Sequence, residues 1–186
     1  MYFLRVITND IRSAQLQFNH YSATKRLVLG ALLAALAAIF QSAGGFFPGV
    51  GYVISPFATA PILLCMMISF WAGMLSYILT CLLLLIIQPS ELIVFPFTTG
   101  LLGVGLGLAF SFFKKRLVIL LVGAAFLTIG IAILLYILRF PVLGPAVSTT
   151  FSIVTLGVIS IFACLYAWGW IEFTSILFKK IKDIIP

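Results

Sequence analysis

Residues 27 to 113 form a stretch of 87 residues that holds a single formally charged side chain, Glu91. Two further stretches, residues 117–138 and 140–171, hold none. A soluble domain faces water with polar side chains, and about a quarter of its residues are charged. In this chain 8% of residues are charged and 63% are hydrophobic. These values exclude a soluble globular domain, a disordered chain and a secreted disulfide-rich scaffold, and they predict an integral membrane protein.

The uncharged stretches are long enough to cross a bilayer as helices. A hydrocarbon core about 30 Å thick needs roughly 20 apolar residues per helix, and backbone groups within it must be hydrogen-bonded inside the protein. A membrane-spanning β-barrel would alternate apolar and polar residues, whereas residues 82–87 read Leu-Leu-Leu-Leu-Ile-Ile. We therefore expect an all-α, polytopic membrane protein in the cell (plasma) membrane.

The basic residues predict the orientation of the helices. Loops rich in Lys and Arg stay in the cytoplasm, so we expect both termini and the loop at 114–116 there. The formal charge of +7 then reflects topology and contact with anionic lipid, and no nucleic-acid partner is needed to explain it. The basic groups are Arg5, Arg12, Lys25 and Arg26; Lys114, Lys115 and Arg116; and Lys179, Lys180 and Lys182, and Arg139 alone falls elsewhere.

Parity sets the number of helices. The segment from 27 to 113 starts and ends on the inside, so it crosses an even number of times, and two crossings would leave too many apolar residues unplaced. Four crossings plus two later ones give a six-transmembrane-helix bundle. Within residues 27–113 the expected breaks are residues 44–51, an uncharged cytoplasmic turn near 69–73, and residues 88–91. Helix five is expected over residues 117–138 and helix six over residues 148–171, with an outside turn at residues 139–141 between them.

The chain thus divides into three parts. Residues 1–26 form a cytoplasmic N-terminal segment that is too long and too polar to be a cleavable signal. Residues 27–172 form the six-helix transmembrane domain, and residues 173–186 form a cytoplasmic amphipathic tail. Both end segments fit either interfacial helices or solvated tails.

The sequence lacks the residues of an intramembrane enzyme. Its single histidine, His20, lies in the N-terminal segment, and no metal-binding, phosphate-binding or nucleophile–base motif is present. Cys65, Cys81 and Cys164 have no metal-type spacing and are expected to be small core residues. We therefore expect no catalysis, no cofactor and no metal.

Polar and aromatic side chains gather in the segments expected at the outer face. Aromatic walls with a few hydrogen-bonding groups are typical of small-molecule sites. The same residues also suit membrane interfaces and helix caps, and threonines can bond to carbonyls of their own helix. The candidate substrate-binding residues are Tyr52, Ser55, Gln88, Glu91, Thr98, Thr99, Arg139, Ser148 and Thr149.

Small residues recur at helical spacing in the first and fourth expected helices. Small residues let helix backbones approach closely in lipid. In the fourth helix Gly100, Gly103 and Gly107 predict internal packing, whereas the contact made by the first helix could be internal or with another subunit. The residues of the first helix are Ala31, Ala34, Ala35 and Ala38.

From about Lys25 onward this pattern resembles the substrate-binding S component of energy-coupling factor (ECF) vitamin transporters. The shared features are a small basic six-helix protein with cytoplasmic ends, the alanine-rich first helix, and a Gly/Pro first loop. Pro56 and Pro61 in the second helix and the glycines from Gly100 to Gly107 also fit.

The resemblance implies a vitamin-like substrate bound near the outer face, under the first loop. It also implies that Ala31, Ala34, Ala35 and Ala38 dock onto a transmembrane coupling subunit driven by two ATPases. No signature of a riboflavin, thiamine or biotin binder is matched, and the low charge favours a neutral or weakly polar substrate. The alternative is a structural or scaffold membrane protein of the cell envelope.

Overall fold

In a computed structural model of this chain, residues 21–47, 49–140 and 152–182 are described, with side chains described as far as Ile176. These residues are mostly helical, and no β-strand occurs among them. Six of the described helices are long and apolar enough to span a membrane. The predicted all-α six-helix bundle of a multi-pass membrane protein is confirmed.

The first, third and sixth spans are single α-helices, and the second, fourth and fifth change helix type along their length. In chain order the spans are α2 (Ala23–Phe46); α3 (Gly51–Ile54), the 3₁₀ turn η2 (Ser55–Ala58) and α4 (Thr59–Ile68); α5 (Phe70–Ile87); α6 (Pro89–Val94), the 3₁₀ turn η3 (Phe95–Phe97) and α7 (Thr99–Phe112); α8 (Arg116–Ala132) and the π-helical turn η4 (Ile133–Ile137); and α9 (Ile153–Lys182).

The uncharged turn expected near residue 69 is present. Ser69 has an extended backbone between α4 and α5, with φ −155° and ψ 125°. Its side-chain Oγ accepts a hydrogen bond from the backbone N–H of Ala72 at 3.5 Å, which caps the N-terminus of α5. One serine therefore separates the second span from the third without any charged residue.

Some helix boundaries differ from the predicted ones. The first span begins at Ala23, before residue 27, because Ser22 caps it by accepting from the Lys25 backbone N–H at 3.4 Å. The sixth span continues past residue 172 to Lys182, so the predicted boundary at 173 falls inside one continuous helix. The predicted start of helix six at 148 and most of the N-terminal segment lie outside the described residues.

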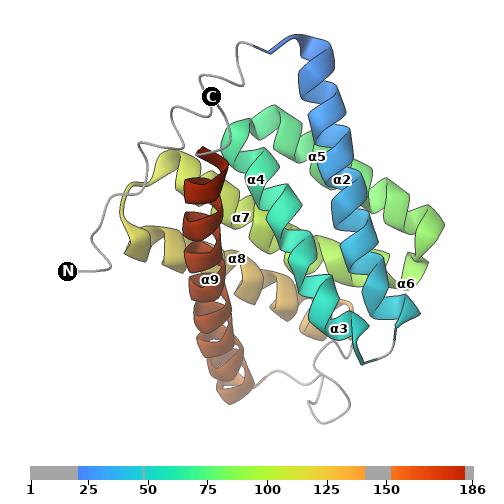
Figure 1. Ribbon diagram of the computed structural model, residues 1–186. Helices are drawn as coiled ribbons and strands as arrows, with labels where there is room; N and C mark the ends of the chain where they lie inside the picture. The colour runs from blue at the N-terminus through green and yellow to red at the C-terminus, as the bar shows by residue number, and fades with distance from the viewer. Residues whose placement is uncertain (1–20, 48, 141–151, 183–186) are drawn as a thin grey trace.

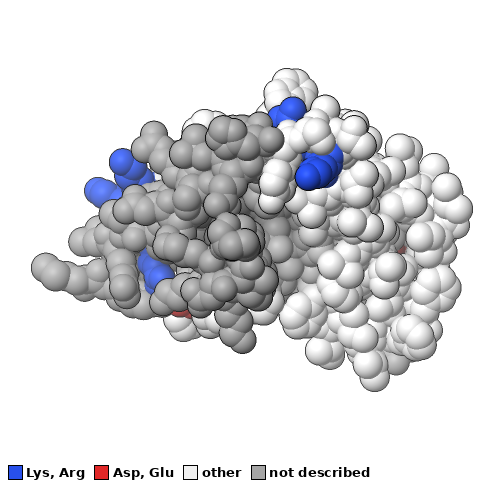
Figure 2. All heavy atoms as spheres, turned by 45° about the horizontal axis from the view of Figure 1, so that its top comes forward, with Lys and Arg blue, Asp and Glu red and all other residues white. Residues whose placement is uncertain are grey.

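The spans alternate in direction, which brings their ends to two opposite sides. In Figure 1 the start of α2 lies at the top, and the α4–α5 turn, the α7–α8 loop and the end of α9 lie towards the upper left. We call this side the basic end, because it carries Lys25, Arg26 and residues 114–116. Figure 2 turns the top of Figure 1 forward and shows blue Lys and Arg side chains in separate groups, and the other described residues in view are mostly white. The α2–α3 and α5–α6 connections lie at the opposite side, the far end.

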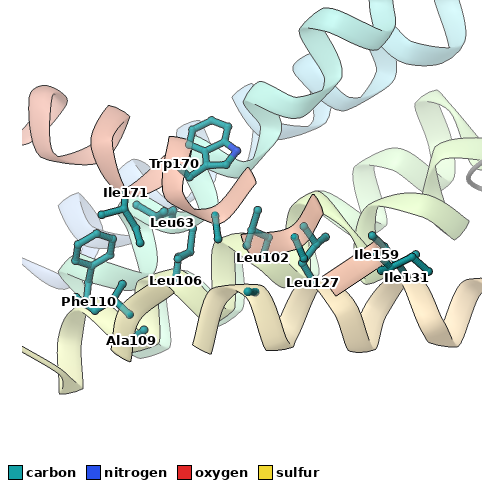
Figure 3. Close-up of a cluster of buried hydrophobic side chains, with 14 of the residues drawn as sticks. Leu63, Leu102, Leu106, Ala109, Phe110, Leu127, Ile131, Ile159, Trp170 and Ile171 are labelled. Atoms are coloured by element: carbon teal, nitrogen blue, oxygen red, sulfur yellow. The ribbon is translucent and has the colours of Figure 1, made fainter. Parts of the chain in front are cut away.

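The main core lies between α4, α7, α8 and α9. Figure 3 shows Leu63 of α4, Leu102 and Leu106 of α7, and Leu127 of α8 converging on this core, with Trp170 of α9 beside them. Each of these side chains is at most 7% exposed. The core ties the second, fourth, fifth and sixth spans together.

Glycines allow α7 to pack closely on α4. A Cβ added at Gly103 would lie 3.0 Å from the Thr59 carbonyl oxygen, and one at Gly107 would overlap the Met66 side chain. Gly100 faces the ring of Phe95 in the same way. The internal packing expected for these glycines is confirmed.

The alanines of α2 divide into two groups, which corrects part of the predicted docking face. Ala34 and Ala38 are 0% exposed, because α2 packs against the rest of the bundle on this side. Thr80 of α5 donates to the Ala34 carbonyl oxygen at 3.2 Å, which holds the two helices together there. These two alanines serve internal contacts and are not available to another subunit, whereas Ala31 is exposed and Ala35 is partly exposed.

Candidate ligand-binding site

Three spans depart from α-helical geometry in the half nearer the far end. The second and fourth are interrupted by η2 and η3, which contain Pro56 and Pro96, and proline cannot supply the backbone N–H that an α-helix needs. The fifth ends in the π-helical turn η4. Irregular backbone at membrane depth is tolerated where protein or a cavity surrounds it, and such turns are frequent at functional sites.

One freed backbone group is satisfied by a neighbouring helix. The Tyr77 hydroxyl of α5 donates to the Pro96 carbonyl oxygen in η3 at 3.0 Å, and the Tyr77 ring stacks on Phe95 with centroids 5.7 Å apart. This support holds the interruption of the fourth span in one conformation. The residues on either side of the interruption are therefore held in fixed positions.

A polar cluster joins the first and fourth spans at the far end. Gln41 of α2 is 1% exposed and lies between Glu91 of α6 and Thr99 of α7. The Gln41 Nε2 donates to Glu91 Oε2 at 2.7 Å, and the Thr99 Oγ1 donates to Gln41 Oε1 at 2.6 Å. We call these three residues the Gln41 cluster.

The chemistry of the carboxylate sets the direction of both bonds. A carboxylate only accepts hydrogen bonds, so Gln41 must turn its amide nitrogen towards Glu91 and its amide oxygen towards Thr99. Thr99 then acts as the donor. The chain of donors runs from Thr99 through Gln41 and ends on Glu91.

The second carboxylate oxygen of Glu91 lies beside a glycine. A Cβ added at Gly44 would lie 3.1 Å from Glu91 Oε1 and 3.4 Å from the Cβ of Ser55. Glu91 and Ser55 therefore both pack against α2 at Gly44, where any side chain would crowd Glu91 Oε1. Ser55, at the start of η2, adds a hydroxyl from the interrupted second span and is 9% exposed.

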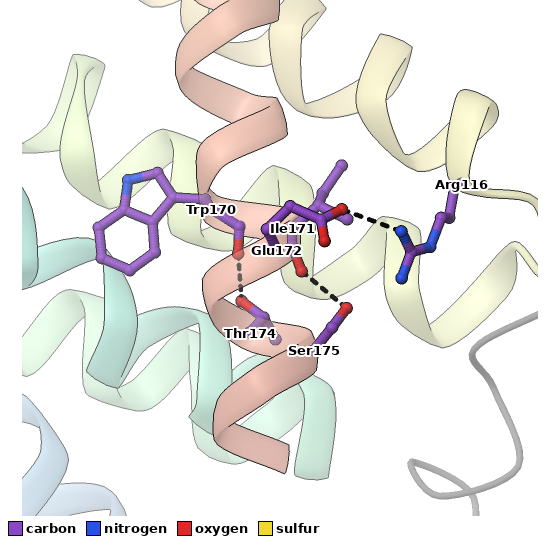
Figure 4. Close-up of polar contacts among 6 residues, drawn as sticks. All are labelled: Arg116, Trp170, Ile171, Glu172, Thr174 and Ser175. Carbon is purple, nitrogen blue, oxygen red and sulfur yellow. Dashed lines mark hydrogen bonds and ion pairs between the residues drawn. The ribbon is translucent and has the colours of Figure 1, made fainter. Parts of the chain in front are cut away.

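No Lys or Arg whose side chain is described forms an ion pair with Glu91. The ion pair that the described residues do form lies at the basic end, where Arg116 of α8 and Glu172 of α9 approach to 2.9 Å. Figure 4 shows the Arg116 guanidinium pointing at Glu172, while Thr174 and Ser175 bond to carbonyls one turn earlier in α9. The cluster at the far end thus carries a carboxylate whose described partners are neutral.

Other predicted substrate-binding residues do not join the cluster. Tyr52 is 69% exposed on α3, and Gln88 donates to the nearby Ser90 hydroxyl at 3.1 Å. Thr98 donates to the Val94 carbonyl oxygen at 2.8 Å, the within-helix bond that the sequence had left open.

The remaining candidates follow the end of the fifth span. Arg139 is exposed and has a φ of 51°, a left-handed conformation that serves to terminate a helix. The left-handed backbone of Arg139 is therefore explained by its place just after the end of the fifth span. Ser148 and Thr149 lie outside the described residues.

Sequence reasoning missed Gln41 and the role of Gly44. A buried amide in an otherwise apolar span is a usable signal, because polar residues within a membrane are costly and mark functional positions. Gln41 is the one residue of the segment 27–46 with an amide side chain. Gly44 had been assigned to a loop, whereas α2 continues through it to Phe46.

The described residues contain no group of three or more His, Cys, Asp or Glu side chains that could hold a metal ion. Cys65, Cys81 and Cys164 are free thiols, and Cys65 is buried. Comparison with protein-family models, with curated proteins and with solved structures finds no match for this chain. The site is therefore interpreted from its own geometry.

Proposed function

We propose that this chain is the substrate-binding membrane subunit of an uptake transporter in the plasma membrane, of the kind represented by ECF S components. It binds a small, vitamin-like molecule at the outer face and does not catalyse a reaction. The observation that carries the proposal is the Gln41 cluster, a buried polar network placed where two proline-interrupted spans meet α2. Discontinuous helices near a polar cluster are a recurrent way to build substrate sites in transporters.

The chemistry of the cluster favours a ligand that offers hydrogen-bond donors. Glu91 Oε2 is taken by Gln41, while Oε1 lies next to Gly44 and Ser55. An N–H or ammonium group of a ligand would bond to that oxygen and offset its charge. This ligand differs from the neutral one that the low charge content alone favours.

Energy for uptake comes from other subunits in this proposal. A coupling transmembrane subunit, driven by two ATPases, contacts α2 on its accessible side. Of the four alanines that the resemblance assigns to docking, Ala31 and Ala35 lie on that side, one helical turn apart. Close approach of a partner helix requires small residues there.

The first experiment identifies the bound molecule. The protein is purified in mild detergent from its own cells, denatured, and the extract is compared by mass spectrometry with extracts of variants. We expect one metabolite to be enriched with the wild type and lost with Glu91→Gln and with Gly44→Ala, whose added methyl would lie 3.1 Å from Glu91 Oε1 and crowd it. Ser90→Ala, which removes an exposed hydroxyl from the same segment, is the matched control and retains the metabolite.

The second experiment tests the partner. Ala35→Trp is expected to abolish co-purification with the coupling subunit and the ATPases, whereas Leu121→Trp, an exposed position on α8, leaves it intact. If no metabolite is enriched and crosslinking in intact cells captures an envelope protein instead, the chain is a scaffold and the proposal is wrong.

A further inference from the structure

An apolar groove runs along the surface between α2 and α5 at the basic end. Its volume is about 660 Å³, and it is distinct from the Gln41 cluster at the far end. Leu27 and Ala31 of α2 form one wall, and Leu75, Ile78 and Leu82 of α5 form the other. These side chains are exposed, so the groove opens on the surface that faces lipid.

The floor of the groove offers no free polar group. Gly30 and Ser76 lie there, and the Ser76 Oγ donates to the Gly30 carbonyl oxygen at 2.5 Å. The helices meet at this bond and again where Thr80 bonds to Ala34. An occupant of the groove is therefore held by apolar contact and not by hydrogen bonds to the floor.

The length of the groove matches one leaflet of a bilayer. From Trp71 to Leu82, α5 rises about 16 Å at 1.5 Å per residue, and half of a hydrocarbon core is about 15 Å. Trp71, which is 76% exposed, stands at the basic end of the groove, the depth at which tryptophan occurs in membrane proteins. A single acyl chain fits this length.

The positive charge of Arg26 at the basic end of the groove favours a lipid with an anionic headgroup. Arg26 lines the same end of the groove and forms no ion pair with any described residue. The neighbouring Lys25 does not line the groove, and its ammonium lies 5.9 Å from the centre of the Tyr21 ring. The guanidinium is thus placed where the phosphate of a lipid would lie when its acyl chain fills the groove.

We propose that the α2–α5 groove is a binding site for one anionic phospholipid of the leaflet at the basic end, with its acyl chain between the helices and its phosphate on Arg26. This inference does not depend on the ligand at the Gln41 cluster, and it leaves Ala35, which does not line the groove, for the contact with a coupling subunit. The lipid covers the exposed apolar walls and links α2 to α5 beyond their direct contacts.

Trp71 reports on the site when Trp168 and Trp170 are changed to Phe. The protein is placed in phosphatidylcholine vesicles that contain a small fraction of phosphatidylglycerol or phosphatidylcholine brominated on the acyl chain, and quenching of Trp71 fluorescence is measured. We expect brominated phosphatidylglycerol to bind about fivefold more tightly than brominated phosphatidylcholine. Arg26→Ala removes this preference, and the matched Lys25→Ala, with the same loss of charge, retains most of it.

A substitution that fills the groove with a protein side chain provides the second test of lipid binding. Ala31→Trp adds a bulky side chain at an exposed position of the wall and is expected to abolish the preference for phosphatidylglycerol. Native mass spectrometry of the chain with its three tryptophans provides a check that needs no Trp168 or Trp170 change: one phosphatidylglycerol is retained, and it is lost with Arg26→Ala. Equal quenching by the two lipids, or equal effects of Arg26→Ala and Lys25→Ala, overturns the proposal. So does a co-purifying membrane protein whose crosslinks to the groove exclude both lipids.

Discussion

The stability contributed by Gln41 can be worked out from its two hydrogen bonds. Changing Gln41 to Leu keeps the approximate volume but removes the bonds to Glu91 and Thr99. Thr99 is 9% exposed as a residue, and its hydroxyl loses its partner, which costs about 1–3 kcal/mol. Glu91 is only partly buried and recovers some hydration, so its loss adds about 1 kcal/mol. We therefore expect Gln41→Leu to lower the free energy of unfolding by about 2–4 kcal/mol.

Thermal unfolding in detergent measures this change, which corresponds to a fall in Tm on the order of 10 °C. Gln88→Leu is the matched control, because it removes an amide whose bond to Ser90 is exposed, and it should change stability by less than about 0.5 kcal/mol. A double-mutant cycle with Thr99→Val isolates the second bond. In the Thr99→Val background, Gln41→Leu should cost about 1 kcal/mol less than in the wild type.

The reasoning is refuted if Gln41→Leu changes stability no more than Gln88→Leu does. It is also refuted if the cycle shows no coupling between Gln41 and Thr99, since two residues joined by a 2.6 Å hydrogen bond must depend on one another. The magnitude of the coupling thus reports on the cluster independently of any ligand.

Four further changes, two of them paired with a control substitution, test other contacts of the fold by the same unfolding assay. Thr80→Val removes the bond between α5 and α2 and should cost about 1 kcal/mol. Gly107→Val should cost about 2 kcal/mol or more, because its Cβ overlaps Met66, whereas Gly157→Ala, with no neighbour within 4 Å, should be neutral or stabilising. Arg139→Gly should stabilise by about 1 kcal/mol, because glycine adopts the φ of 51° without strain. Glu172→Gln should cost about 1–3 kcal/mol through the ion pair with Arg116, while the exposed Lys114→Ala should have no measurable effect.

The fold could be predicted from the sequence because the lipid bilayer permits few kinds of spanning structure. Lipid requires helices of about 20 apolar residues, so the lengths of the uncharged stretches and the parity of the basic loops lead to six spans. The turn at Ser69 followed from parity alone. The continuation of α9 past residue 172 did not, because the added lysines suggest a change of environment and do not break a helix.

The candidate site could be predicted only in part. Sequence reasoning chose Glu91, Thr99 and Ser55, which the fold brings to neighbouring positions, but it missed Gln41, which connects the first two. The connection depends on the rotation of α2 about its axis, and that rotation is set by packing of Ala34 and Ala38 against the bundle. The same rotation removes these alanines from any docking face. Spacing along one helix cannot distinguish a side that packs internally from one that meets a partner.

The proposed function depends on the far end facing the outside of the cell. In a variant that lacks Cys65, Cys81 and Cys164, a cysteine is introduced by Tyr52→Cys at the far end or by Lys114→Cys at the basic end, both at exposed positions. A membrane-impermeant maleimide is then applied to intact cells. We predict that the Tyr52→Cys variant is labelled in intact cells and that the Lys114→Cys variant is labelled only after permeabilisation. Labelling of the Lys114→Cys variant alone in intact cells would place the Gln41 cluster on the inside and contradict the account.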